Sequence, residues 1–347
     1  MAAHLLPTFA THHLQSKTFA LAHTFTFVVR ASPVRLRHCV TRLSARISDG
    51  HFLTAVSKPV LIAAANCAAV PAAAARIADR VDIEGFADTL DFDVRACVGA
   101  VLEALRTHKA AASAVPSVCI DELLYDLLGV AQLAGSLRNA VGRGPPPVQR
   151  ITLENLVTDV VENLAAFAVE KFGVAPPTVV TASPAGHTTA IIAPALISYA
   201  IAELLKNSYS AHIARYTAAG VDDAPPVRIR IGGRSNIAWI CVEDEGGGLD
   251  DRGGCRDVFE YNRAPAQPLR EASYYYSRDF GATFSGMGVG LARSRVMALF
   301  SGGGLSIQSA PGLGARALLT LDATGRIAPD VWVYRDAASQ GLEGAIP

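Results

Sequence analysis

The sequence has no excess charge of either sign, because Lys and Arg together number 31 and Asp and Glu together also number 31. Non-specific binding to nucleic acid depends on a cationic surface, so this balance argues against a nucleic-acid-binding protein. Charged residues are also few, at 18%, whereas 50% of the residues are hydrophobic. A chain of 347 residues with this composition can bury a sizeable core and is long enough for two domains of ordinary size.

Paired cysteines and long apolar runs are missing too. The six cysteines lie at positions 39, 67, 97, 119, 241 and 255, without a CxxC pair and without histidines at metal-ligand spacing. Neither a disulfide framework nor a zinc site is expected, and isolated thiols are the better interpretation. The uncharged run over 59–75 is mostly alanine and contains two prolines. Because a membrane span needs about 20 strongly apolar residues, we predict none.

Acidic residues are absent before Asp49, whereas the first 38 residues contain four Lys or Arg residues and five of the nine histidines. A segment rich in basic and hydroxyl residues and poor in acids is typical of a mitochondrial transit peptide. We predict that residues 1–24 are this peptide and that the protein is imported into the mitochondrial matrix. A basic start to the first helix is the alternative for the later part of the segment. The other histidines are expected at the surface.

Apolar residues recur at steps of three and four in the first half of the chain, which is the spacing of one helix face. This pattern predicts helices over 92–105, 120–137 and 153–167. The segment 142–147, with sequence GRGPPP, separates the last two. Because no strand signal accompanies these helices, residues 25–172 are predicted to form a helical bundle.

The pattern changes after residue 173. Pro194 opens a predicted helix, since proline is tolerated in the first helical turn. Apolar residues alternate with arginines over 227–231, as in a half-buried strand, and a turn over 232–236 separates them from an apolar run. Strands are therefore predicted over 227–231, 237–242, 305–309 and 317–321. Residues 173–347 are predicted to form an α+β domain.

Two carboxylate motifs in this half suggest chemistry. Glu203 and Asn207 are four residues apart on the predicted helix and share one face. A carboxylate can polarise a nucleophile, and an amide oxygen can ligate Mg²⁺, although polar pairs are also common on solvated helix faces. Asp244 follows a strand and precedes three glycines, so its carboxylate could meet a flat ligand. A simple turn is the alternative there.

Two glycine motifs complete the set. The sequence GMGVGL over 286–291 leads into an apolar helical run, where backbone N–H groups and the helix dipole can face phosphate. A Rossmann site is not favoured, because a loop of some 35 residues, rather than a strand, precedes these glycines. The shorter glycine motif PGLGA lies between the last two predicted strands.

The order Glu-x-x-x-Asn, Asp-x-Gly-x-Gly, Gly-x-Gly-x-Gly and Gly-x-Gly resembles the GHKL ATPase superfamily. This resemblance implies an α + α/β fold: an N-terminal helical bundle of the four-helix type, followed by a GHKL-type α/β sandwich that binds ATP and Mg²⁺. Residues 252–285 would be the mobile lid of the site.

Within that superfamily the chain is most similar to the mitochondrial protein kinases, namely the pyruvate dehydrogenase kinases and the branched-chain 2-oxoacid dehydrogenase kinases. The similarity rests on Phe25-x-Phe27, Asp159-x-x-Glu162-Asn163, Glu203-Leu-Leu-Lys206-Asn207, Phe259-x-Tyr261 and Val333-Tyr334. It implies a protein-serine kinase that inhibits the E1 component of a mitochondrial 2-oxoacid dehydrogenase complex. It further implies a homodimer and a bundle that docks a lipoyl domain of E2.

The resemblance also assigns roles to residues. Glu203 would polarise the substrate hydroxyl, Asn207 would ligate Mg²⁺, Asp244 would read the adenine amino group and Lys206 would meet phosphate charge. Ser210, where the family has an arginine, is placed with the nucleotide-binding residues. The segments shaping the pocket and the phosphate loop would contribute Gly246, Gly248, Gly286, Met287, Gly288, Val289, Gly290 and Leu291.

Some family positions differ in this chain. The family has a histidine four residues before the helix glutamate, where this chain has Tyr199, and a threonine in the last glycine motif, where it has Ala315. The glutamate, the asparagine and Asp244 are kept. Two functions therefore stay open: a protein kinase, and an ATP-binding regulator of the same fold with weak or absent catalysis.

Overall fold

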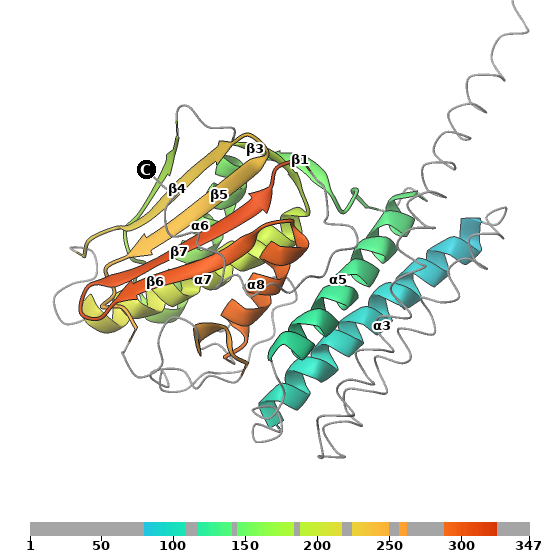
Figure 1. The fold of residues 1–347 in the computed structure, drawn as a ribbon, viewed down its shortest axis with the longest axis horizontal. Helices are drawn as coiled ribbons and strands as arrows, with labels where there is room; N and C mark the ends of the chain where they lie inside the picture. Colours follow the sequence, from blue (N-terminus) through green and yellow to red (C-terminus); the bar gives the residue numbers. More distant parts are fainter. Residues whose placement is uncertain are drawn as a thin grey trace, which may run out of the picture.

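The computed structural model describes residues 80–107, 117–140, 144–183, 188–216, 224–249, 257–261 and 288–324 (Figure 1). The predicted transit peptide, the bundle segment before residue 80, most of the predicted lid and the tail after residue 324 lie outside these residues. None of the described helices combines the length and the apolar character that crossing a membrane requires.

Two long helices lie side by side at one end of the molecule (Figure 1). They are α3 (Arg80–Thr107) and α5 (Ser117–Ala140). Their contact is apolar, because the buried side chains follow helical spacing on both: Val94, Cys97, Val101 and Ala104 on α3, and Ile120, Leu123, Leu127, Val130 and Ala134 on α5. Both helices were predicted. The remaining helices of the expected bundle fall outside the described residues.

A short strand in the predicted helical half corrects the expectation of helices alone. Strand β1 (Gln149–Thr152) pairs antiparallel with β3 (Thr189–Ile192). Four residues are too few for a clear alternating pattern, and the partner strand comes about 40 residues later. The sequence alone therefore gave no signal for this pairing.

Helix α6 (Leu153–Phe172) follows β1 directly and ends at Gly173, whose φ of 77° is left-handed and whose N–H bonds to Val169 O at 2.8 Å. The helix lies before the predicted domain boundary at residue 173. Its buried face, from Leu153 to Ala168, nevertheless packs in the same core as the sheet described next.

Five strands form one mixed sheet in the order β2-β4-β5-β7-β6. β2 runs parallel to β4, and every other neighbouring pair is antiparallel. The strands are β2 (Thr178–Ala182), β4 (Val227–Arg234), β5 (Ile237–Asp244), β6 (Gly304–Ala310) and β7 (Gly314–Asp322). The structure thus has helices and a mixed sheet, which agrees with the predicted α+β class.

The turn between β4 and β5 is shorter than predicted. Strand β4 continues through both glycines to Arg234, and Ser235, with φ 57°, and Asn236 make the turn. A side chain at Gly232 would overlap the indole ring of Trp239, its cross-strand partner. Gly232 therefore serves close packing within the sheet rather than the turn.

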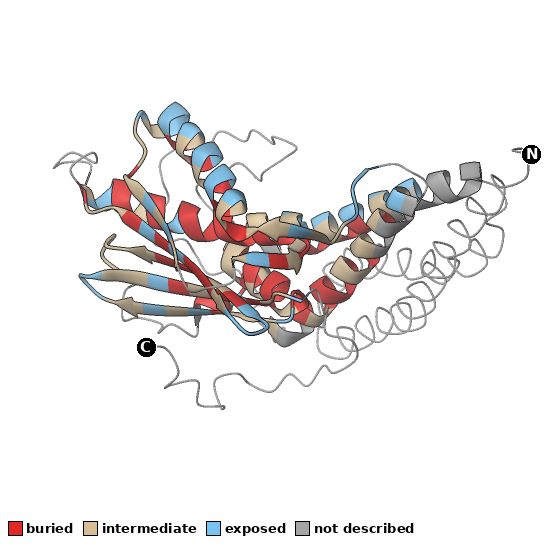
Figure 2. Cartoon of the chain, turned by 90° about the horizontal axis from the view of Figure 1, so that it is seen from above, coloured by how far each residue is buried: buried red, intermediate tan, exposed pale blue. Residues whose placement is uncertain are grey.

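Helices α6, α7 (Pro194–Tyr216) and α8 (Gly290–Phe300) lie together on one face of this sheet (Figures 1 and 2). The core between them contains apolar residues of every layer, such as Ile201 and Leu205 of α7 and Ile229 and Ile240 of the sheet. Helix α7 is buried on most of its circumference, because the sheet, α6 and α8 surround it. Pro194 begins it, as predicted.

Candidate functional site

The predicted motifs come together around α7. Asp244, at the end of β5, lies against α7 at Ser208. The glycine segment that begins α8 contacts the same helix at Glu203.

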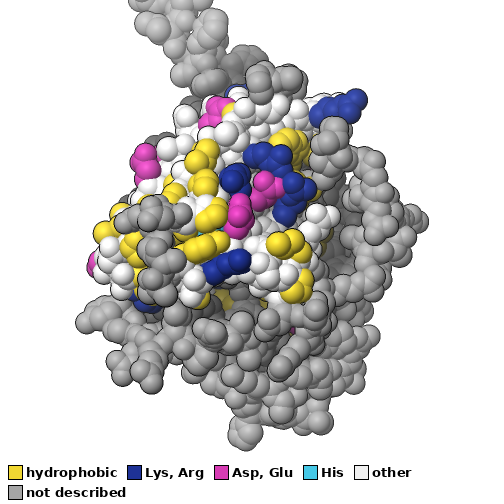
Figure 3. All heavy atoms as spheres, turned by 90° about the vertical axis from the view of Figure 1, so that its left-hand side faces the viewer, with side chains coloured by type: hydrophobic (Ala, Val, Ile, Leu, Met, Phe, Trp, Pro, Cys, Tyr) yellow, Lys and Arg dark blue, Asp and Glu magenta, His cyan; other side chains and the backbone are white. Residues whose placement is uncertain are grey.

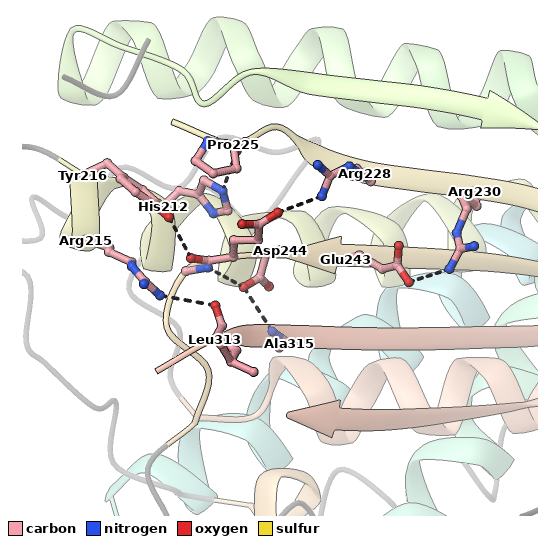
Figure 4. Close-up of polar contacts among 12 residues, drawn as sticks. His212, Arg215, Tyr216, Pro225, Arg228, Arg230, Glu243, Asp244, Leu313 and Ala315 are labelled. Carbon is pink, nitrogen blue, oxygen red and sulfur yellow. Dashed lines mark hydrogen bonds and ion pairs between the residues drawn. The ribbon is translucent and has the colours of Figure 1, made fainter. Parts of the chain in front are cut away.

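Asp244 is the last residue of β5, and its carboxylate is fixed by three donors. Ser208 Oγ of α7 donates to Oδ2 at 2.9 Å. The backbone N–H groups of Gly246 and Ala315 donate to Oδ1 at 3.0 Å and 3.3 Å, and Figure 4 shows the contact with Ala315. Such bonds orient a carboxylate and stabilise its charge. Sequence reasoning missed Ser208, since a serine beside Asn207 carries no motif of its own.

The glycines after Asp244 are required by backbone packing. A side chain at Gly246 would overlap Ala211 of α7, and one at Gly248, whose φ is 73°, would overlap the carbonyl of Ala310. The prediction was that these glycines let backbone approach a ligand. In the structure the close approach is between Asp244's own loop, α7 and the end of β6.

The C-terminal end of α7 contacts the short glycine motif PGLGA, which connects β6 to β7. Arg215 donates to the carbonyl oxygens of Gly312 and Leu313 at 3.0 and 3.2 Å. Tyr216 Oη donates to Glu245 O at 3.2 Å, and Figure 4 shows the contacts of Arg215 with Leu313 and of Tyr216. Gly312 N–H donates to Gly247 O at 2.7 Å. These bonds hold the glycine turn that follows Asp244 against the glycine turn between β6 and β7.

One histidine corrects the expectation that the histidines lie at the surface. His212 is fully buried, with Nδ1 3.2 Å from Ser208 O. Its Nε2 lies 2.9 Å from Pro225 O (Figure 4). Its ring therefore ties α7 to the segment that leads into β4, one turn after the serine that holds Asp244.

Glu203 lies at the contact between α7 and α8, and only 8% of it is exposed. Its Oε1 pairs with Lys206 on the same helix. A side chain at Gly290, the first residue of α8, would overlap its Oε2. The position therefore requires glycine, and the carboxylate lies directly against the end of the glycine segment.

Asn207, one turn after Glu203, is exposed, whereas Glu203 and Lys206 are buried. An exposed amide oxygen beside a buried carboxylate can reach a ligand without moving the helix, and oxygen is the ligand that Mg²⁺ prefers. No group of three or more His, Cys, Asp or Glu side chains that could hold a metal occurs among the described residues. A metal here would depend on Asn207 and on oxygens of a bound nucleotide.

Tyr199, one turn before Glu203, packs between α7 and α8. The guanidinium of Arg293 lies 4.5 Å from the centre of its ring. Burial raises the pKa of Tyr199, and the neighbouring Glu203 carboxylate raises that pKa further, against an opposing effect of Arg293. The phenol therefore keeps its proton throughout the neutral range.

The remaining predicted residues lie at the start of α8, on α7 or outside the described residues. Gly288 has φ 72°, Val289 is buried and Leu291 packs at the edge of the core, so all three shape the start of α8. Ser210 Oγ is buried and, within the described part of the chain, has no hydrogen-bond partner. It is a polar atom that a ligand or water could satisfy. Gly286 and Met287 lie outside the described residues.

The pair of long helices touches the site through α8. Asp121 of α5, 1% exposed, accepts hydrogen bonds from Tyr261 Oη and Arg295 Nη2, both at 2.6 Å. Tyr261 follows the 3-10 helix Asp257–Phe259 (η2), within the predicted lid, and Arg295 also lies over the Phe259 ring at 4.9 Å. Sequence reasoning missed this junction, because its members lie up to 174 residues apart.

The side of the molecule where β5 ends presents basic and acidic side chains next to one another (Figure 3). On the outer face of the sheet Glu243 accepts hydrogen bonds from Arg230 and Arg316, and Arg228 donates to Glu245 at 2.9 Å. Burial alone would raise the pKa of Glu243, but the bonds from Arg316 and Arg230 outweigh it and lower that pKa.

Comparison with known proteins gives a partial match. No protein-family model matches the chain. The chain spans only 33% of the length of the curated relative that it matches. The match covers 35% of this chain. Over those 127 residues it is 39% identical to the mitochondrial [pyruvate dehydrogenase (acetyl-transferring)] kinase of Arabidopsis thaliana.

Proposed function

We propose that the chain is an ATP-dependent protein-serine kinase of the pyruvate dehydrogenase kinase type. The observation that carries the proposal is the meeting of Glu203 with the glycine segment at Gly290, where a side chain would not fit. A carboxylate at the start of a glycine-led helix is suited to a site where a hydroxyl meets a phosphate. The partial identity to a mitochondrial kinase supports the same function.

The residues present fit a nucleotide and Mg²⁺. Asp244 accepts three hydrogen bonds, yet an ionised carboxylate has about four lone-pair positions. One acceptor position therefore remains for the adenine amino group. The buried hydroxyl of Ser210 and the exposed amide of Asn207 add polar atoms on the same helix. ATP would supply the phosphoryl group, and Mg²⁺ would offset its charge.

In this proposal each residue has one task. Glu203 orients the attacking serine hydroxyl and accepts its proton, and Lys206 offsets negative charge beside it. Asn207 holds the metal, while Gly288, Val289, Gly290 and Leu291, together with Gly286 and Met287, bring backbone N–H groups to the phosphates. Residues 252–285 form the lid.

The partial identity to a mitochondrial kinase also suggests a physiological role. We propose that the substrate is a serine of the E1 component of a pyruvate or branched-chain 2-oxoacid dehydrogenase complex, in the mitochondrial matrix. Residues 1–24 would direct import, residues 25–172 would form the bundle that meets a lipoyl domain of E2, and residues 173–347 would form the kinase domain. The active form would be a homodimer.

A second function is favoured by a specific contact. Glu203 is already paired with Lys206 and neighbours the Tyr199 hydroxyl, so its lone pairs are partly used. A protein that binds ATP and transfers phosphate slowly or not at all would show this arrangement. It would act as a regulator of the same dehydrogenase complex.

Phosphate transfer to purified protein decides between the two functions. The full chain is incubated with Mg-ATP and purified E1 of each complex, and phosphoserine is located by mass spectrometry. The kinase proposal predicts new phosphoserine on one E1, dependent on the chain and on Mg²⁺. ATP binding by calorimetry without transfer to any E1 would favour the regulator, and absence of both would refute nucleotide binding.

A further inference from the structure

The two oxygens of the Asp244 carboxylate are not equally occupied. Oδ1 accepts from two backbone N–H groups, that of Gly246 at 3.0 Å and that of Ala315 at 3.3 Å. Among the described residues, Oδ2 accepts from a single donor, the hydroxyl of Ser208 at 2.9 Å. A carboxylate has about four acceptor positions, two on each oxygen. The position that remains for a ligand is therefore on Oδ2, beside Ser208.

Backbone packing closes the Oδ1 side to a ligand. Ala315 on β7 is the cross-strand partner of Asp244, and Figure 4 shows it bonded to the carboxylate. A side chain at Gly314 would overlap the backbone carbonyl of Asp244, and one at Gly246 would overlap Ala211 of α7. Because both glycines keep backbone tightly against the aspartate, a ligand cannot replace their N–H donors without moving a strand or the glycine turn.

The hydroxyl of Ser208 is committed to Asp244. A hydroxyl has one proton and an ionised carboxylate only accepts, so Ser208 is the donor of this bond. Ser208 is 4% exposed, and the next residue ties its helix to β2, because Tyr209 Oη lies 2.7 Å from Thr178 Oγ1. The hydroxyl therefore fills one of the two positions on Oδ2 from a fixed place on α7.

The number of open positions distinguishes nucleobases. Adenine presents one donor group at its edge, the exocyclic amine, next to a ring nitrogen that accepts. Guanine presents two adjacent donors, a ring N–H and an exocyclic amine. With Ser208 on one position of Oδ2, Asp244 can accept from one further donor but not from two. A guanine edge would leave one donor without a partner, which costs binding free energy.

We propose that Ser208 is the specificity-determining residue of the base site, because its hydroxyl fills the second position of Oδ2 and thereby excludes guanine. The inference rests on the proposed function, since it requires a nucleotide at Asp244. Asp244 attracts an amine of either base, and Ser208 sets how many donors Asp244 can take. The choice between ATP and GTP is thus made by a residue of α7.

The test compares three variants of Ser208 with wild type. Ser208→Ala removes the hydroxyl, Ser208→Cys nearly keeps the size but donates weakly, and Ser208→Thr keeps the hydroxyl. Ser306→Ala is the matched control, because Ser306 is exposed on β6. Calorimetry on the full chain with Mg²⁺ gives the affinities for ATP, GTP and ITP, which has the ring N–H of GTP but lacks the exocyclic amine. Melting curves report whether each variant is folded.

Wild type should prefer ATP to GTP, and Ser208→Ala should bind GTP about tenfold more tightly than wild type does, since a hydrogen bond to a charged group is gained. Its affinities for ATP and ITP should change by less than about threefold, because a single donor already has its acceptor in wild type. Ser208→Cys should gain affinity for GTP too, but less. Ser208→Thr and Ser306→Ala should match wild type.

Four results would overturn the inference. Unchanged GTP affinity in folded Ser208→Ala and Ser208→Cys, with ATP still bound, would refute the role of Ser208 and leave the kinase function standing. So would an equal gain for GTP and ITP, because the second donor would then not be what Ser208 excludes. A gain in Ser208→Thr as large as in Ser208→Ala would show that the hydroxyl is not the cause. Binding of neither ATP nor GTP by any of the folded proteins would refute nucleotide binding itself, and with it both proposals.

Discussion

Asp121 of α5 and Arg295 of α8 form an ion pair at 2.6 Å, in which the carboxylate is 1% and the guanidinium side chain 19% exposed. The pair joins the two long helices to the half of the molecule that carries the sheet. Removing one partner of a buried pair leaves an uncompensated charge, which is far costlier than the loss of an exposed pair.

Asp121→Asn should therefore destabilise the protein by about 3–5 kcal/mol. The amide oxygen can still accept from Tyr261 but no longer offsets the charge of Arg295. Urea unfolding measures the free energy of unfolding. Asp91→Asn is the matched control, because Asp91 bonds Arg95, which is 73% exposed, and Arg138. A loss no greater than that of the control would mean that the junction contributes little.

Asp244→Ala should weaken ATP binding by about ten- to a hundredfold, since a hydrogen bond to a charged group contributes roughly 1.5–3 kcal/mol. Calorimetry with ATP and GTP measures the effect, and wild type should prefer ATP. Glu245→Ala removes a neighbouring carboxylate that pairs with the half-exposed Arg228, and it should bind ATP as wild type does. Equal affinity of wild type for both nucleotides would defeat the adenine assignment.

Asn207→Ala should remove most of the Mg²⁺-dependent part of ATP affinity while leaving the melting temperature unchanged, because the side chain is exposed. Titrations with and without Mg²⁺ separate the two parts. Asn163→Ala, an exposed amide on α6, is the control. If Asn207→Ala binds Mg-ATP as tightly as wild type, the residue is only part of a solvated helix face.

Glu243→Gln should destabilise the protein by about 1 kcal/mol at neutral pH, as expected for a partly exposed ion-pair network. The pKa of Glu243 is lowered in the fold by Arg316 and Arg230 despite burial. The stabilisation is therefore present above the ordinary carboxyl pKa and is lost as pH falls through the lowered value. Melting curves from pH 7 down to about pH 3 should converge for wild type and variant. A constant difference across that range would contradict this assignment.

The sequence predicted most helices and strands because their side-chain periodicity is strong. The burial of Ile229 and Ile231 and the exposure of Arg230 follow the predicted alternation. Strand β1 was missed because four residues carry no readable period, and its partner is distant in the chain.

Of the site, residue types and helix faces could be predicted, but partners could not. Glu203 and Asn207 lie on α7 as expected. That Ser208 holds Asp244, that Arg293 covers Tyr199 and that His212 is buried all depend on contacts between separate elements. The packing of α7 against β5, α8 and the segment before β4 creates these contacts. The burial of Lys206 and its pairing with Glu203 could not be predicted from the sequence either.

Glu203 is proposed to be the base of a phosphate transfer from ATP. Glu203→Gln keeps the shape of the side chain and much of its hydrogen bonding but cannot accept the proton. Phosphate transfer to purified E1 should then fall by about 10²–10⁴-fold while ATP affinity, measured by calorimetry on the same preparation, stays nearly unchanged. Transfer by Glu203→Gln at the wild-type rate would show that Glu203 is not the base.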